Sequence, residues 1–97
     1  MDIKFSGFDW DDGNRNKNLQ KHGIVCQEAE EVFMGRPLVY SDTVHSTEAE
    51  PRYVLLGETK KGMRLFVAFT LRQENVRVIS ARPMSQKERT WYEQTKK

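Results

Sequence analysis

Three charged residues in the second half of the chain, Glu58, Arg64 and Arg82, have the types and spacing for chemistry on a phosphodiester. RNA cleavage without a metal needs a base for the 2′-hydroxyl proton, cations for the charge that develops on the phosphate, and an acid for the leaving oxygen. Arginine binds phosphate oxygens bidentately and keeps its charge, and Glu58 could be the base. The acid stays open among His22, Lys21, Tyr53 and an arginine.

Strand register decides whether these side chains can meet. Lys60-Lys61-Gly62 has the form of a three-residue hairpin loop with glycine in the left-handed conformation. This loop sets Glu58 opposite Arg64, and it joins two of three apolar, alternating segments that we predict to be neighbouring antiparallel strands, residues 53–58, 65–71 and 76–81.

The next connection, Gln73-Glu74-Asn75, is expected to be a similar loop with Asn75 left-handed. The pairs are then Arg72 with Val76, Thr70 with Val78, Ala68 with Ser80 and Phe66 with Arg82. Alternation places a core face on the opposite side, made of Leu55, Val67, Phe69, Ile79 and Ala81.

In this register Arg82 lies on the same face as Glu58 and Arg64, on the diagonal and roughly 7–8 Å away. Arg72 shares the face but sits at its far end, roughly 20 Å from Phe66, too far to share one phosphate with Arg82. The alternative interpretation is a plain surface ion pair between Glu58 and Arg64.

The remaining elements predict an α+β fold. Asp11 or Asp12 can cap a helix that runs to about His22, and a second helix covers residues 27–34. Residues 37–42 can form a short edge strand, and Ser85 with Glu88 fits a capping box that opens a short C-terminal helix. A chain of 97 residues is expected to be one domain, residues 1–97, whose small core favours a site on the open face of the sheet.

Charge is divided unevenly along the chain. Residues 1–51 carry five Lys/Arg against ten Asp/Glu, a net −5, and residues 52–97 carry eleven against four, a net +7. This asymmetry favours a polyanion or a charged protein as partner, although a solvated surface would look the same.

The other compositional signals point to a cytoplasmic protein without a cofactor. The single cysteine, Cys26, excludes an internal disulfide, and no segment resembles a signal peptide or a membrane span. The chain has only two histidines, His22 and His45, and one cysteine, Cys26, and they are widely spaced, so we expect no structural zinc site and no cofactor.

Several segments resemble the BrnT family of toxins, in the family's order over nearly the whole chain. They are Phe8-Asp9-Trp10-Asp11, Asn18-Leu19-Gln20-Lys21-His22-Gly23-Ile24, Glu28-Ala29-Glu30-Glu31-Val32-Phe33, Arg52-Tyr53 with Leu56-Gly57, Thr70-Leu71-Arg72, Ile79-Ser80-Ala81-Arg82, and Glu88-Arg89 with Tyr92.

The resemblance implies a RelE-like fold, with a twisted, mainly antiparallel sheet and two N-terminal helices against it, and a ribonuclease that halts growth. It also implies a partner, a BrnA-like antitoxin with a ribbon-helix-helix domain, in a homodimer or a toxin–antitoxin heterotetramer. The implied functional residues fall on Glu58, Arg64, Arg72 and Arg82, with Lys21 and His22 near a helix end. We also expect Arg52, Tyr53 and Arg77 to contact RNA.

One departure from the family pattern concerns the first helix. Many members carry lysine where this chain has Asn14, which leaves open a weakened or differently tuned toxin. A second function also stays open, a non-catalytic module that binds nucleic acid or an antitoxin and acts in repression of its own operon.

Overall fold

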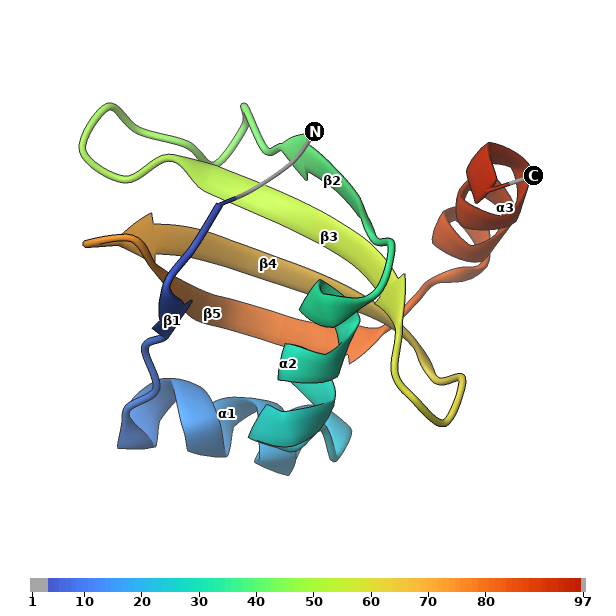
Figure 1. The fold of residues 1–97 in the computed structure, drawn as a ribbon, viewed down its shortest axis with the longest axis horizontal. Helices are drawn as coiled ribbons and strands as arrows, with labels where there is room; N and C mark the ends of the chain where they lie inside the picture. The colour runs from blue at the N-terminus through green and yellow to red at the C-terminus, as the bar shows by residue number, and fades with distance from the viewer. Residues whose placement is uncertain (1–3, 97) are drawn as a thin grey trace.

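The computed structural model describes residues 4–96, apart from the side chains of residues 16–20. The chain forms β1 Gly7–Phe8, α1 Asp12–His22, α2 Cys26–Met34, β2 Leu38–Ser41, β3 Arg52–Glu58, β4 Arg64–Arg72, β5 Asn75–Pro83 and α3 Gln86–Lys96 (Figure 1). The five strands make one sheet in the order β1-β5-β4-β3-β2. Its pairs are antiparallel except for the parallel pair of β1 and β5, so the predicted α+β class is confirmed.

One face of the sheet carries the main core. Leu55, Val67, Phe69 and Ala81 point to this face and are fully buried, as alternation predicts. Helix α2 packs there with Ala29 and Val32, and Figure 1 shows it lying across the sheet. Edge-to-face aromatic contacts at 5.0–5.7 Å extend this core toward the N-terminus, through Phe5, Phe8, Phe33 and Phe69.

The opposite face is covered at one end by α3. Tyr92 of α3 is buried with Leu56 and Met84, and the half-buried Leu38, Tyr40 and Phe66 pack around them. Trp91 stands edge-on to Tyr40, with ring centroids 5.4 Å apart. The expected capping box is present, since the Ser85 N–H donates to Glu88 at 2.8 Å and the Glu88 N–H donates to the Ser85 hydroxyl at 3.2 Å.

The first predicted hairpin is confirmed and the second is partly wrong. Gly62 has a φ of +85°, and Glu58 pairs with Arg64, Leu56 with Phe66 and Val54 with Ala68. The second turn has only two central residues, Gln73 and Glu74, with φ of +51° and +70°. The pairs beside this turn are therefore Arg72 with Asn75, Leu71 with Val76 and Thr70 with Arg77.

A β-bulge on β5 restores the predicted register farther along the strand. Ala68 pairs with Ser80 and Phe69 pairs with Val78, which leaves Ile79 without an opposite residue. Ile79, predicted as core, is only half-buried, and Val78 takes its place in the core. The shorter turn and the bulge each shift the pairing of β4 and β5 by one residue, in opposite directions. Phe66 therefore still pairs with Arg82, as predicted.

Asn14 ties the start of α1 to the edge of β5. Its side chain is almost fully buried; its amide donates to the carbonyls of Asp9 at 3.1 Å and Val78 at 3.2 Å, and its oxygen accepts the Asp11 N–H at 2.7 Å. Asn14 is thus a structural clamp in this chain.

Among the described helices, none has the length and apolar character that a membrane crossing requires.

An Asn14→Ala variant is expected to lose about 2 kcal/mol of unfolding free energy, because partly buried carbonyls lose their donor. Urea unfolding at neutral pH measures this loss, with the exposed neighbour Arg15→Ala as the control. Equal stability of the two variants would show that the clamp contributes nothing.

Candidate functional site

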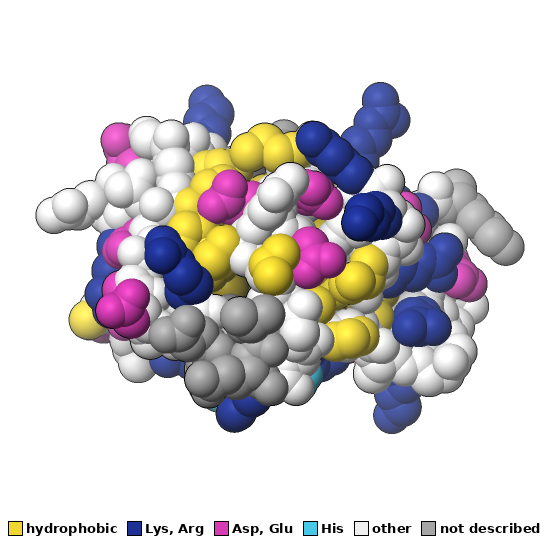
Figure 2. All heavy atoms as spheres, turned by 90° about the horizontal axis from the view of Figure 1, so that it is seen from below, with side chains coloured by type: hydrophobic (Ala, Val, Ile, Leu, Met, Phe, Trp, Pro, Cys, Tyr) yellow, Lys and Arg dark blue, Asp and Glu magenta, His cyan; other side chains and the backbone are white. Residues whose placement is uncertain are grey.

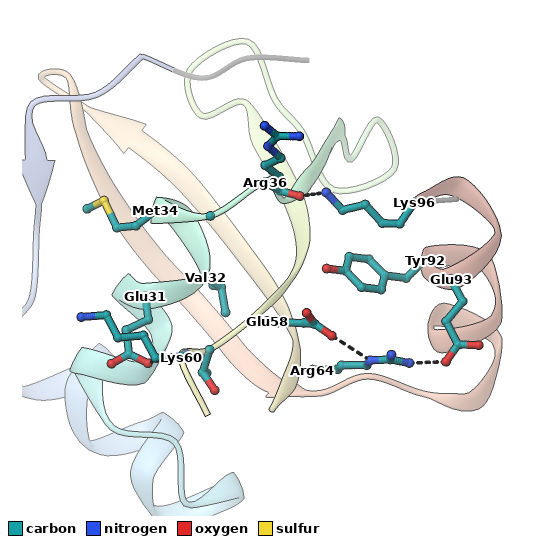
Figure 3. Close-up of a pocket in the computed structure, with 12 residues that line it drawn as sticks. Glu31, Val32, Met34, Arg36, Glu58, Lys60, Arg64, Tyr92, Glu93 and Lys96 are labelled. Atoms are coloured by element: carbon teal, nitrogen blue, oxygen red, sulfur yellow. Dashed lines mark hydrogen bonds and ion pairs between the residues drawn. The ribbon is translucent and has the colours of Figure 1, made fainter. Parts of the chain in front are cut away.

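Arg64 lies between two carboxylates. Its Nε donates to Glu58 Oε1 at 3.1 Å across the β3–β4 pair, and its Nη1 binds the carboxylate of Glu93 on α3 (Figure 3). The three side chains are partly exposed, with 32% of Arg64, 42% of Glu58 and 54% of Glu93 accessible. A ligand arriving from solvent can therefore reach the guanidinium and both acids.

Arg82 is held more firmly on the same face. Its two terminal nitrogens donate to the two oxygens of Glu88 at 2.8 and 2.9 Å, a bidentate pair. Its guanidinium also stacks over the ring of Phe66, 3.9 Å from the ring centroid. Because Phe66 pairs with Arg82 and lies two residues from Arg64 along β4, the backbone positions of the two arginines are diagonal neighbours, as the predicted register requires.

Ion pairing fixes the charge of both arginines. Hydrogen bonds raise the pKa of Arg64 above its ordinary value, and the bond to Glu93 has a larger effect than the bond to Glu58. The hydrogen bonds to Glu88 raise the pKa of Arg82 in the same way. Both guanidiniums therefore stay charged and can stabilise an anion, but they are poor proton donors for a leaving group.

Partial burial alone would raise the pKa of Glu88, but hydrogen bonds from Arg82 and from the Ser85 N–H outweigh it and hold this pKa below its ordinary value of 4.5. Because the pKa of Glu88 is lower in the folded protein than in the unfolded chain, ionised Glu88 stabilises the folded protein above pH 4.5. This stabilisation is lost as the pH falls through the folded-state pKa. We expect wild type to be more stable than Glu88→Gln at about pH 7, and the difference to shrink toward about pH 3. Urea unfolding at both pH values measures it, and a constant difference would contradict the ion pair's role.

A groove of about 770 Å³ adjoins the Glu58–Arg64 pair. Its walls are the end of α2, the start of the β3–β4 loop and α3, with Val32, Met34, Lys60, Tyr92 and Lys96 among the lining residues (Figure 3). Gly57 allows α2 to lie this close, since a Cβ there would stand 3.1 Å from the Val32 carbonyl oxygen. The sequence favours a site on an open sheet face; the structure adds a groove beside Glu58 and Arg64 that α3 closes on one side, and Arg82 is not among the residues that line it.

The end of the molecule around this groove is basic. Figure 2 shows Lys and Arg side chains gathered at the right, the end where Figure 1 places α3 and the β3–β4 loop. The exposed cations on these two segments are Lys60, Lys61, Lys87, Arg89 and Lys96. Within residues 4–96, no group of three or more His, Cys, Asp or Glu side chains is arranged to hold a metal ion.

Several of the predicted functional residues lie elsewhere. Lys21 and His22 are exposed at the end of α1 and do not line the groove. Arg72 lies at the far end of the face, where it and Arg52 contact the carboxylate of Glu50 at 3.7 and 3.6 Å. The structure therefore brings together Glu58, Arg64 and Arg82 and leaves these four residues outside the group.

Tyr53 and Arg77 are engaged in packing and ion pairs. Tyr53 stacks on Phe69 with centroids 5.5 Å apart, on the core face of the sheet and away from Arg64. Arg77 contacts Asp11 at 2.5 Å and Asp9 at 3.5 Å. Of the acid candidates named from the sequence, only an arginine lies beside Glu58.

Sequence reasoning misses the acids of α3. It predicts only a helix cap for Glu88 and no role for Glu93. The capping box does predict where α3 begins, but the direction in which the helix leaves β5 follows from the burial of Tyr92 and Met84 on the sheet. The position of Glu93 beside Arg64 depends on this packing, which no local pattern encodes.

Comparisons with known proteins bear on the family and the fold of this chain. The family model "Ribonuclease toxin, BrnT, of type II toxin-antitoxin system" matches residues 10–88. The crystal structure of the Brucella abortus ribonuclease toxin BrnT is similar with a TM-score of 0.62 and 28% identity, over 82% of this chain and 97% of that chain. No curated protein matches. Because the family model covers most of the sequence, this chain belongs to the BrnT family of ribonuclease toxins of type II toxin–antitoxin systems.

Proposed function

We propose that this chain is an endoribonuclease that cleaves RNA without a metal, at a site formed by Glu58, Arg64 and Arg82. The supporting observation is one carboxylate and two permanently charged guanidiniums on one sheet face, at the same end of three strands. In a family named for ribonuclease toxins, such a group matches the needs of phosphodiester cleavage better than those of a stabilising surface pair.

The proposed reaction is a transesterification. The Glu58 carboxylate takes the proton of a ribose 2′-hydroxyl, and the 2′-oxygen attacks the adjacent phosphorus. The bond from phosphorus to the 5′-oxygen breaks, and that oxygen takes a proton from solvent. Arg64 and Arg82 stabilise the negative charge on the phosphate oxygens as it develops. The products are a 2′,3′-cyclic phosphate and a 5′-hydroxyl end.

We further propose the biological setting that the resemblance implies. The fold is of the RelE-like type, and the protein acts in the cytoplasm, where its RNA substrate is found. Its antitoxin is a BrnA-like protein with a ribbon-helix-helix domain, and the toxin forms either a homodimer or a heterotetramer with this antitoxin. The family description supports an antitoxin partner of some kind.

Expression of the chain in bacterial cells tests the toxin proposal. Induction should arrest growth, and co-expression of the protein encoded by the adjacent reading frame should restore it. A Glu58→Ala/Arg82→Ala double variant that folds should be harmless. Full toxicity of this variant would show that the site is misplaced.

A non-catalytic binding module is the second candidate. It is favoured by the fact that both arginines are already paired with carboxylates, as on a passive protein surface. Salt-sensitive RNA binding without any cleavage product, together with harmless expression of the chain alone, would support this candidate and reject catalysis.

A further inference from the structure

Both arginines of the proposed site are occupied by acids from α3. Glu88 accepts hydrogen bonds from both terminal nitrogens of Arg82, and Glu93 binds the Nη1 of Arg64. A phosphate group uses these same guanidinium donors, since carboxylate and phosphate oxygens match the arginine fork in similar geometry. An RNA phosphate that binds through these donors has to take the place of the carboxylate at each arginine.

The two acids belong to one element that spans both arginines. Glu88 lies in the first turn of α3, beside β5, and Glu93 lies farther along the helix, beside β4. Tyr92, between them, anchors the helix on the sheet. A single docked helix thus presents one carboxylate to each guanidinium.

We propose that Glu88 and Glu93 occupy, in the free protein, the positions of two RNA phosphates, so that α3 is a built-in competitor of the substrate. The inference rests on the proposed function, because it takes Arg82 and Arg64 as the phosphate-binding groups. It adds that the ligand spans at least two phosphates and that the C-terminal helix sets the affinity for RNA.

The strength of the Arg64–Glu93 ion pair is suited to such competition. The side chain of Arg64 is 32% exposed and that of Glu93 is 54% exposed, and ion pairs of this kind contribute little stability. A polyanion can therefore displace Glu93 without unfolding the helix. Only molecules in which the two arginines are free of Glu88 and Glu93 can bind RNA in this way. The apparent association constant for RNA is therefore the intrinsic constant multiplied by the fraction of such molecules.

Glu88 is the stronger of the two competitors. Its side chain is only 20% exposed, and its carboxylate is held by Arg82 and by the Ser85 N–H at the start of α3. Glu93 lies beyond the matched residues 10–88 of the family model. We therefore place part of the control of RNA affinity in the last turns of α3, outside the matched segment.

Direct binding of RNA to the full chain tests the proposal. The probe is a fluorescent single-stranded oligonucleotide with 2′-O-methyl groups, which cannot be cleaved by attack of the 2′-oxygen. The test variant is Glu88→Gln/Glu93→Gln, in which the glutamine that replaces Glu88 retains the capping-box pattern. The matched control is Glu48→Gln/Glu74→Gln, which changes the net charge equally at exposed positions.

The test variant should bind the probe about tenfold more tightly than wild type, and the control within about twofold of wild type. Adding Arg64→Ala/Arg82→Ala to the test variant should abolish this gain. If the arginines are needed for binding but the test variant binds no more tightly than the control, the competition is overturned and the proposed site stands. If removing the arginines has no effect on binding, both the competition and the proposed site are wrong.

Discussion

An Arg82→Ala variant of the full chain is expected to cleave RNA at least about 100-fold more slowly than wild type, because it lacks one of two cations that stabilise the charged phosphate. The single-turnover rate on a short single-stranded RNA measures this effect directly. Arg82 also stacks on Phe66 and pairs with Glu88, so thermal unfolding must show that the variant remains folded.

Two further substitutions make this result specific. Arg72→Ala removes an arginine from the same face but at its far end, where it contacts only Glu50 among the acids of the described residues, and should leave the rate within about twofold. Arg82→Lys keeps the charge but loses the bidentate fork, so its rate should be intermediate. Equal losses in Arg72→Ala and Arg82→Ala would mean that the basic surface acts as a whole and not as a site.

A Glu58→Gln variant is expected to lose about 100-fold to 10,000-fold in the cleavage rate, the range for removal of a general base. Its affinity for the uncleavable 2′-O-methyl RNA should not fall, because glutamine has the same shape and the arginines remain. Glu50→Gln, which removes an acid from the far end of the same face, is the control. Unchanged cleavage by Glu58→Gln would exclude this carboxylate as the base.

The first hairpin was predictable because its sequence carries a specific turn signal. Gly62 adopts the left-handed conformation that a three-residue loop requires, and this sets Glu58 opposite Arg64. The second hairpin lacked such a signal. Gln73 and Glu74 both have positive φ, a conformation for which Asn and Gly are the usual residues, so the shorter turn could not be read from their types.

Alternation predicted which face of the sheet a strand residue lies on better than local patterns predicted its contacts with the helices that cover the sheet. Tyr53 lies two residues before the core residue Leu55, so alternation alone places it on the core face and away from Arg64. The prediction that Tyr53 contacts RNA did not take this alternation into account. The contacts of Glu88 and Glu93 depend on how α3 packs on Leu56 and Met84, which is tertiary information.

The end groups of the RNA fragments test the proposed mechanism most directly. Purified chain should be incubated with single-stranded RNA and an excess of a metal chelator, and the new ends identified by mass spectrometry. We predict 2′,3′-cyclic phosphate and 5′-hydroxyl ends, and no cut at a nucleotide whose 2′-hydroxyl is replaced by hydrogen. Fragments with 3′-hydroxyl and 5′-phosphate ends, or cleavage that stops when the chelator is added, would contradict the mechanism.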